Sequence, residues 1–309
     1  MVTPPVRRPG PGLPHAIAME LPFTRYTLPI DGHSVHFVDT GPADADVAVW
    51  LQHGNPTWCF LWRDVIRRLT GLRVVAPDLV GFGLSSKPRR GGFHTVEGHV
   101  ARAVALADAL GVRRWVLVGQ DWGGPIVAGL GAARPDRVAG LVLANTAVLP
   151  PRRPIRSTPF HRLARVPGLA DALFVGCGFP LGMLHTAQAD RRSLPDVAMR
   201  AYRYPFTRRR DRAGPLALAR MVPGGASHPS VPALDRIGKW VQSYRGPTEL
   251  VWGVADPILG RAVRRHAREL SHAAVTTLHA GHFLQEEVPG ALAAAIHRVH
   301  AGGATVSAG

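Results

Sequence analysis

The stretch Trp115-Val-Leu-Val-Gly-Gln-Asp-Trp-Gly-Gly124 decides the fold, because it predicts a buried strand, a tight turn and then a helix. Glycines at 119, 123 and 124 let the backbone bend sharply and let the helix begin close to the strand. Such a turn lifts the side chain of Asp121 to the carboxyl end of a parallel sheet, where α/β proteins bind ligands. A carboxylate there is ionised at neutral pH, so it can attack carbon without a base and form an ester.

Apolar segments on both sides of this unit extend it into an α/β domain. Most are short and apolar throughout, and helical patterns separate several of them, which is typical of parallel strands covered on both faces. We therefore expect a mostly parallel, eight-stranded sheet with helices on both faces. The predicted strands are 24–30, 34–38, 47–52, 72–76, 115–118, 140–144, 248–252 and 274–278.

The same pattern divides the chain into four parts. Residues 1–20 are expected to be a disordered leader, since the first 13 are rich in Pro, Arg and Gly and lack the apolar core of a signal peptide. The core is expected at 21–147 and again at 236–309. Between the two halves, residues 148–235 carry helical patterns without a clear strand and form a predicted cap. Its start is marked by Pro150, Pro151, Pro154 and Pro159.

Composition excludes several classes of protein. The 309 residues are 46% hydrophobic, enough for one large core domain with an insertion. Two cysteines, Cys59 and Cys177, rule out a disulfide scaffold and argue against a cysteine-built zinc site. Cysteine usage of this kind fits a reducing, cytoplasmic location. No run of about 18 apolar residues occurs, so we expect no membrane span.

The chain is strongly basic, with a formal net charge of +16, and arginine supplies all but two of its 37 basic residues. Between residues 148 and 240, basic residues outnumber acidic ones by 16 to 5. Such an excess could serve a nucleic-acid surface. No aromatic-interleaved strand or recognition-helix pattern accompanies it. We therefore interpret the charge as a solvated face and expect no nucleic-acid partner.

Polar residues gather where four predicted strands end. These junctions are His53-Gly-Asn-Pro-Thr-Trp58, the turn at Asp121, Trp252-Gly-Val-Ala-Asp-Pro257 and Ala280-Gly-His-Phe283. All four lie at the same edge of the predicted sheet. Their order along the chain is nucleophile, acid and histidine, which is the order expected of α/β-hydrolases.

With these motifs the chain resembles the haloalkane dehalogenases, an α/β-hydrolase family with an inserted cap. The motifs HGNPTWCFLWR, PDLVGFGLSSKP, GQDWGGPI, WGVADP and GHFLQEE match the landmarks of that family from about residue 24 to 300. The resemblance is greatest to the branch whose acid follows the strand after the cap and whose halide donor is an asparagine. It implies hydrolysis of a small halogenated hydrocarbon by water, with release of halide and without a metal or organic cofactor.

The resemblance also implies a role for each residue. Asp121 would be the nucleophile, His282 would activate water against the resulting ester, and Asp256 would hold the imidazole. Asn55 and Trp122 would donate hydrogen bonds to the departing halide, as N–H groups in a dry pocket can. Their backbone N–H groups would form the oxyanion hole of the second step.

Further residues follow from the same comparison. Residues 143–146, at the end of the predicted strand before the cap, contain no carboxylate. Asp256 is therefore the only acid that the resemblance places well. Asn145 is expected to hold a hydrogen bond nearby. Pro205 and Phe206 resemble a cap segment that lines the family's pocket. His279 and His282 are three residues apart without an evident third ligand, so we expect no metal site.

Two alternatives stay open. An epoxide hydrolase resembles this family and has the same aspartate turn, and it would protonate an alkoxide with two cap tyrosines; here the candidates are Tyr202 and Tyr204. Asn55 argues against it, because such enzymes usually carry an apolar or aromatic residue there. A non-catalytic small-molecule binder on the same scaffold is the alternative from another class. The sequence is compatible with a homo-oligomer.

Overall fold

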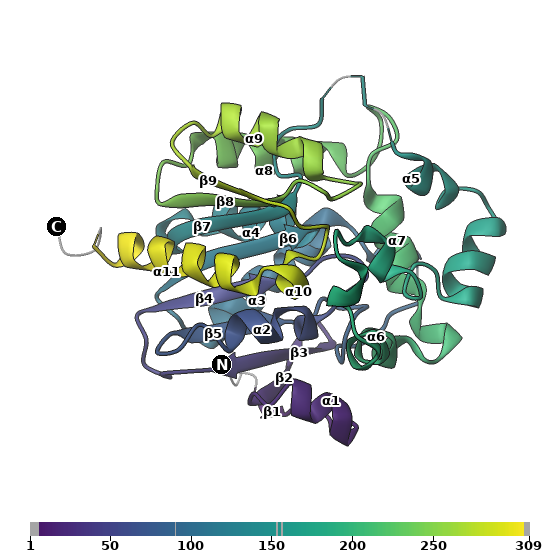
Figure 1. The fold of residues 1–309 in the computed structure, drawn as a ribbon, viewed down its shortest axis with the longest axis horizontal. Coiled ribbons are helices and arrows are strands. Elements are labelled where there is room, and N and C mark those ends of the chain that lie inside the picture. Colours follow the sequence, from purple (N-terminus) through teal and green to yellow (C-terminus); the bar gives the residue numbers. More distant parts are fainter. Residues whose placement is uncertain (1–5, 90, 153, 156, 306–309) are drawn as a thin grey trace.

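A computed structural model describes residues 6–305 except residues 90, 153 and 156 (Figure 1). Within these residues, one sheet has the strand order β1-β2-β3-β5-β4-β6-β7-β8-β9. The pairs from β5 through β4 and β6 to β9 are parallel, and those joining β1, β2, β3 and β5 are antiparallel. The strands are β1 Arg8–Pro9, β2 Arg25–Ile30, β3 His33–Thr40, β4 Val47–Gln52, β5 Arg73–Pro77, β6 Arg114–Asp121, β7 Val138–Thr146, β8 Thr248–Gly253 and β9 Ala274–Leu278.

The predicted mostly parallel sheet is confirmed, but the described residues give it nine strands instead of eight. The additional strand is β1, which pairs with β2 at the sheet edge. It lies in the segment that we expected to be a disordered leader, as does α1 (His15–Glu20). A proline-containing segment can pair at an edge, where no second neighbour requires its missing N–H. Ile17 and Leu21 then bury their side chains, which anchors α1 on the core.

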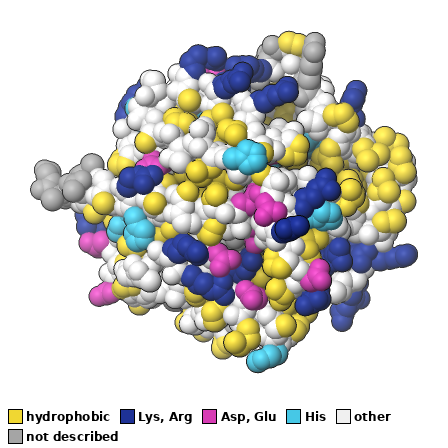
Figure 2. All heavy atoms as spheres, in the orientation of Figure 1, with side chains coloured by type: hydrophobic (Ala, Val, Ile, Leu, Met, Phe, Trp, Pro, Cys, Tyr) yellow, Lys and Arg dark blue, Asp and Glu magenta, His cyan; other side chains and the backbone are white. Residues whose placement is uncertain are grey.

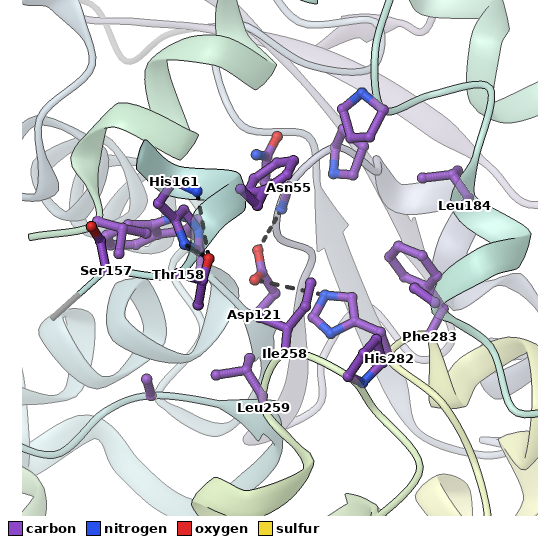
Figure 3. Close-up of a pocket in the computed structure, with 18 of the residues that line it drawn as sticks. Asn55, Asp121, Ser157, Thr158, His161, Leu184, Ile258, Leu259, His282 and Phe283 are labelled. Carbon is purple, nitrogen blue, oxygen red and sulfur yellow. Dashed lines mark hydrogen bonds and ion pairs between the residues drawn. The ribbon is translucent and has the colours of Figure 1, made fainter. Parts of the chain in front are cut away.

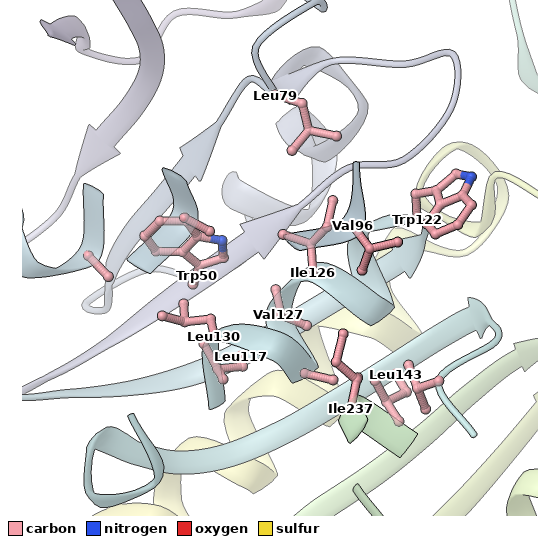
Figure 4. Close-up of a cluster of buried hydrophobic side chains, with 14 of the residues drawn as sticks. Trp50, Leu79, Val96, Leu117, Trp122, Ile126, Val127, Leu130, Leu143 and Ile237 are labelled. Atoms are coloured by element: carbon pink, nitrogen blue, oxygen red, sulfur yellow. The ribbon is translucent and has the colours of Figure 1, made fainter. Parts of the chain in front are cut away.

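Helices cover both faces of the sheet because every second side chain of a strand points to the same face. Trp50, Leu117 and Leu143 join the core under α3, α4 and α8 (Figure 4). Their neighbours Val49, Val116 and Val142 join the core under α2 and α11. The remaining helices are α2 Arg63–Ile66, α3 Val96–Leu110, α4 Gly123–Ala133, α5 Pro159–Leu163, α6 Asp196–Arg203, α7 Ala213–Met221, α8 Val231–Ser243, α9 Val263–Glu269, α10 Leu284–Glu287 and α11 Pro289–Thr305.

The helical insertion between β7 and β8 lies at one end of the sheet, at the right of Figure 1. It contains α5 to α7, a π-helical turn and several 3-10 turns, around a small core of its own that includes Phe174 and Leu216. The boundary expected after residue 235 falls inside α8. Ile237 of that helix packs in the main core, so α8 belongs to the layer over the sheet. The short turns are η1 Cys59–Trp62, η2 Gly91–Phe93, η3 Pro135–Arg137, η4 Asp171–Cys177 (π), η5 Leu184–Ala187, η6 Arg191–Ser193, η7 Tyr204–Phe206, η8 Arg209–Asp211 and η9 Gly260–Ala262.

Several arginines of the cap tie its own loops together. Arg212 donates to the carbonyl oxygens of Phe206 and Gly176 at 2.7 and 2.9 Å, and Arg220 donates to that of Ala164 at 2.8 Å. Figure 2 shows basic side chains spread over the visible face, with acidic and hydrophobic ones between them. Part of the arginine excess therefore satisfies backbone carbonyls where regular structure is sparse. No helix in the described part of the chain is both long and apolar enough to cross a membrane.

Candidate active site

The carboxyl ends of β4 and β6 form the crevice in which the candidate residues meet. From β4 the chain moves to β5 on one side, and it then returns to add β6 on the other side. Such a reversal leaves a gap between the loops that follow the two strands. Asn55 follows β4 and Asp121 ends β6. The backbone N–H of Asn55 donates to Oδ1 of Asp121 at 2.7 Å.

Asp121 sits on a strained turn between β6 and α4. Its φ of 52° lies in the left-handed region, which costs a residue other than glycine about 1–2 kcal/mol. The turn also packs too tightly for side chains at two glycines. A Cβ on Gly123 would lie 2.1 Å from the carbonyl oxygen of Gln52, and one on Gly124 would lie 2.0 Å from Oγ1 of Thr146. The glycines of the motif are thus needed to bring Asp121 beside the loop after β4.

The side chain of Asp121 is half-buried, with 18% of its surface exposed, and it is well supplied with donors. Burial raises its pKa, while the nearby His282 and the backbone N–H groups of Asn55 and Trp122 oppose that rise. The indole of Trp122 lines the same space, and within the described structure its Nε1 has no hydrogen-bond partner. Nδ2 of Asn55 donates to the carbonyl oxygen of Pro215 in the cap at 3.1 Å, which ties this side chain to the cap.

A histidine–aspartate pair faces Asp121. Nδ1 of His282 lies 2.8 Å from Oδ2 of Asp256. Its Nε2 lies 3.7 Å from Oδ2 of Asp121, and Figure 3 shows this ring facing Asp121. Asn145 donates to the same Oδ2 of Asp256 at 2.7 Å, which confirms the hydrogen bond expected near this residue. The backbone N–H of Ile258 donates to Oδ1 at 2.7 Å. Asp256 is therefore held on both oxygens while it orients the ring.

The two carboxylates set the protonation of His282. Burial disfavours the charged ring, but the hydrogen-bonded Asp256 and the more distant Asp121 outweigh it and raise the pKa of His282 to about 9. The pKa of Asp256 is lowered, because His282, Asn145 and the N–H of Ile258 together outweigh its burial. The free site therefore favours an imidazolium between two carboxylates at neutral pH.

One residue next to the turn was missed by the sequence analysis. Gln120 is fully buried, and its Nε2 lies 3.0 Å from the carbonyl oxygen of His282 and 3.2 Å from Nε2 of its ring. Gln120 precedes the nucleophile candidate at the end of β6, where the left-handed φ of Asp121 interrupts the alternation of side chains. Only the proximity of His282 in space gives this amide a partner.

A cavity of about 480 Å³ opens above Asp121, between the core and the cap. Asp121, His282, Asn55 and Trp122 all line it, and most other lining side chains are apolar. Water is poorly held by such walls, which strengthens every charge interaction inside. The apolar lining includes Phe160, Phe179, Leu184, Val222, Leu234, Ile258, Leu259 and Phe283.

The expected cap contribution of Pro205 and Phe206 is wrong. Neither residue lines this cavity, and both are buried in the turn η7. The ring of Phe206 packs edge-on against Phe82, with 5.9 Å between centroids. Helix α6 leads directly into η7 and turns these side chains toward the sheet core. Sequence spacing alone carries no information about that direction.

A single group among the described residues has the spacing of a metal site, and it lies outside the cavity. It consists of His36, Cys59 and Asp78, all buried. The carboxylate of Asp78 already accepts hydrogen bonds from the N–H of Cys59 at 2.7 Å, the N–H of Leu84 at 2.8 Å and Nδ1 of His36 at 2.8 Å. Its oxygens are thus occupied by donors, and the arrangement fits a structural hydrogen-bond centre better than a cation.

Comparison with known proteins agrees with this geometry. The model of the alpha/beta hydrolase fold family matches residues 47–289. A haloalkane dehalogenase of Mycobacterium marinum is 35% identical over 262 residues, which cover 82% of this chain and 84% of the relative. Haloalkane dehalogenase 2 of Mycobacterium tuberculosis is 33% identical and covers 85% of this chain and 90% of its own. The crystal structure of the haloalkane dehalogenase DbeA from Bradyrhizobium elkani has a TM-score of 0.79 at 29% identity, and the match covers 90% of this chain and 98% of that one.

This chain belongs to the haloalkane dehalogenase family. The family resemblance read from the sequence motifs is thereby confirmed, as is the α/β-hydrolase fold. Of the five residues that the resemblance selected, Asn55, Asp121, Trp122 and His282 line one cavity, and Asp256 lies behind His282 on its Nδ1. As a haloalkane dehalogenase relative, the chain places its histidine-bound acid, Asp256, after β8, which is the strand that follows the cap.

Proposed function

We propose that this chain is a hydrolytic dehalogenase that converts a haloalkane and water into an alcohol, a halide ion and a proton. The observation that carries the proposal is a half-buried carboxylate, Asp121, at the floor of an apolar cavity and 3.7 Å from a histidine that a second carboxylate orients. Membership of the haloalkane dehalogenase family supports the same reaction.

In the first half-reaction a carboxylate oxygen of Asp121 attacks the halogen-bearing carbon from the side opposite the halogen. The new C–O bond forms as the carbon–halogen bond breaks, and the halide leaves with the electron pair. A halide gains little from protonation, so it depends on hydrogen-bond donors. Nε1 of Trp122 is free to donate, and Nδ2 of Asn55 has a second N–H besides the one given to Pro215.

In the second half-reaction His282 removes a proton from water, and the oxygen of that water attacks the ester carbonyl of Asp121. The backbone N–H groups of Asn55 and Trp122, which hold the carboxylate at rest, are placed to stabilise the resulting oxyanion. The ester C–O bond then breaks, the departing alcohol oxygen takes the proton that His282 had removed, and Asp121 returns to a carboxylate as the second water proton passes to solvent. The negative charge of Asp121 is one cause of the raised pKa of His282, and esterification removes that charge. Loss of that charge lowers the pKa and favours the neutral ring that the step requires.

The epoxide hydrolase alternative lacks its proton donors. An epoxide opens to an alkoxide, which an acidic hydroxyl must protonate in a water-poor site. The chain has four tyrosines, all within the described residues, and none of them lines the cavity. The hydroxyl of Tyr202 is instead directed to Glu286, and the ring packs edge-on against Phe60. A non-catalytic binder would have no use for a strained nucleophile beside an oriented histidine.

The proposal is tested by a panel of 1-bromo- and 1-chloroalkanes with styrene oxide beside them. We expect bromide release with stoichiometric alcohol, slower release of chloride if carbon–halogen cleavage limits the rate, and little diol from the epoxide. Ion chromatography measures halide, and gas chromatography measures alcohol and diol. Diol formation faster than halide release would show that the epoxide reading is correct instead.

The two halide donors are expected to act on the first half-reaction. Asn55→Ala or Trp122→Phe should slow halide formation by roughly 10-fold or more, because each removes a donor to developing charge in a dry site. Stopped-flow quenching of Trp fluorescence by bromide, or rapid-quench halide assays, would measure that step. Trp252→Phe is the matched control for loss of an indole, since the Trp252 N–H donates to the carbonyl oxygen of Leu259. Unchanged halide formation in both donor variants would remove them from the site.

A further inference from the structure

The cap side of the catalytic cavity carries a small polar wall that the dehalogenation steps do not use. Ser157, Thr158 and His161 line the same cavity as Asp121. Figure 3 shows them together on one side, with His282 and Phe283 on the other side and Asp121 between. Ser157 and His161 are half-buried and Thr158 is exposed, so a ligand that covers them has to replace the water on their polar atoms with a polar group of its own.

The hydrogen bonds within this wall determine what it can offer. Oγ1 of Thr158 lies 2.7 Å from Nδ1 of His161 and also accepts a long bond, 3.5 Å, from the backbone N–H of His161. The Thr158 hydroxyl has one proton, which it can donate to Nδ1. In that tautomer the ring carries its hydrogen on Nε2, for which the described structure shows no partner.

The charge of the wall is also determined by its surroundings. Burial, together with the nearby Arg165 guanidinium, lowers the pKa of His161 to about 4, so the ring is neutral at pH 7. Arg165 itself donates to Oγ of Ser157 at 3.0 Å and to the carbonyl oxygen of Val222. None of the described residues that line the cavity is Lys or Arg. Arg165 is engaged by Ser157 and Val222, so the lining offers no free Lys or Arg to a negatively charged substrate.

Resting on the proposed dehalogenase function, we infer that His161, with Ser157 beside it, binds an uncharged hydrogen-bond acceptor at the far end of the substrate. The favoured substrates are neutral haloalkanes that carry an ether, hydroxyl or carbonyl oxygen several carbons from the halogen. Nε2–H of His161 and the hydroxyl of Ser157 donate to that oxygen. The halogen-bearing carbon lies meanwhile at Asp121. A plain haloalkane of equal length leaves both donors without a partner.

The contact is tested with two bromides of equal length, 1-bromoheptane and 1-bromo-5-methoxypentane, which differ by one CH₂ replaced by oxygen. The measured quantity is kcat/KM for the ether divided by kcat/KM for the alkane. His161→Phe keeps an aromatic ring but removes the donor, so this ratio should fall by roughly 5-fold, as loss of one neutral hydrogen bond predicts. His161→Gln restores an N–H donor and should recover much of the ratio.

Thr186→Val is the matched control, because Thr186 lines the cavity but its hydroxyl donates to the carbonyl oxygen of Met183 at 2.7 Å. Its ratio should equal that of the unmodified chain. An unchanged ratio in His161→Phe, or an equal fall in Thr186→Val, would overturn the inference. The products 1-heptanol and 5-methoxy-1-pentanol allow the same comparison by binding alone. Calorimetry measures their dissociation constants, and the binding ratio compares the affinity for the ether with the affinity for the plain alcohol. A change in that binding ratio without any bromide release would instead contradict the proposed reaction and leave the contact supported.

Discussion

His282→Phe is expected to release one bromide per protein molecule and then to stop. Displacement by Asp121 needs no base, so the first half-reaction proceeds without the imidazole. The ester then persists, because His282 is the group placed to activate water beside Asp121. Rapid-quench halide assays should show a burst equal to the enzyme concentration, and mass spectrometry should find the alkyl group on the peptide that contains Asp121.

The burst distinguishes the two half-reactions, and a second variant provides the control. Asp256→Asn should also accumulate the ester but turn over slowly, because the ring remains and only its orientation and charge stabilisation are weakened. Circular dichroism would verify that both variants fold. Steady turnover in His282→Phe at the rate of the unmodified chain would show that another group activates the water. A burst that is absent although the variant is folded would show that His282 also serves the first step.

Asp121→Asn is expected to abolish both the burst and the turnover, with a loss of roughly 10,000-fold or more, as removal of a nucleophile causes in other enzymes. An amide oxygen is a much poorer nucleophile than a carboxylate. Asparagine is the substitution of choice because it tolerates the left-handed backbone at φ 52° better than alanine does. The halide assay for this variant is run in parallel with His282→Phe.

The fold of Asp121→Asn can be checked independently of activity. The melting temperature should stay within a few degrees of that of the unmodified chain, since the N–H of Asn55 can still donate to an amide oxygen. Intact mass must confirm that asparagine has not hydrolysed to aspartate during storage. A stoichiometric bromide burst from protein of the correct mass would show that residue 121 is not the nucleophile.

Much of the core could be predicted from the sequence because its signals are local. The strand and glycine pattern around Asp121 predicted a turn, and the structure has that turn with close packing at Gly123 and Gly124. The eight expected strands all occur, although several ends differ by a few residues. The segment before residue 20 was not predictable, because β1 and α1 are ordered by contacts with β2 and with the core.

The candidate site likewise contains some residues that the sequence predicts and others that it does not. Asp121 ends a strand, and Asn55, Asp256 and His282 follow strand ends, so parallel topology alone predicts that they meet. Gln120, the polar wall and the true direction of Phe206 could not be predicted. The cap has no sheet to give its side chains a fixed periodicity, and short turns such as η7 set their direction. Phe206 consequently packs in the core and Pro205 is buried beside it, while His161 reaches the cavity.

The sequence by itself determined the chemistry that this protein can perform. Carboxylate, imidazole and N–H donors are properties of residue types, and glycine spacing dictates a turn that exposes one of them. Only the tertiary structure decided which groups share a cavity and in what charge state. The pKa of His282 is raised to about 9 by Asp256 and Asp121, which are 26 and 161 residues away along the chain. Electrostatic interactions depend on distance in space and on burial, and neither is defined until the cap has closed over the sheet.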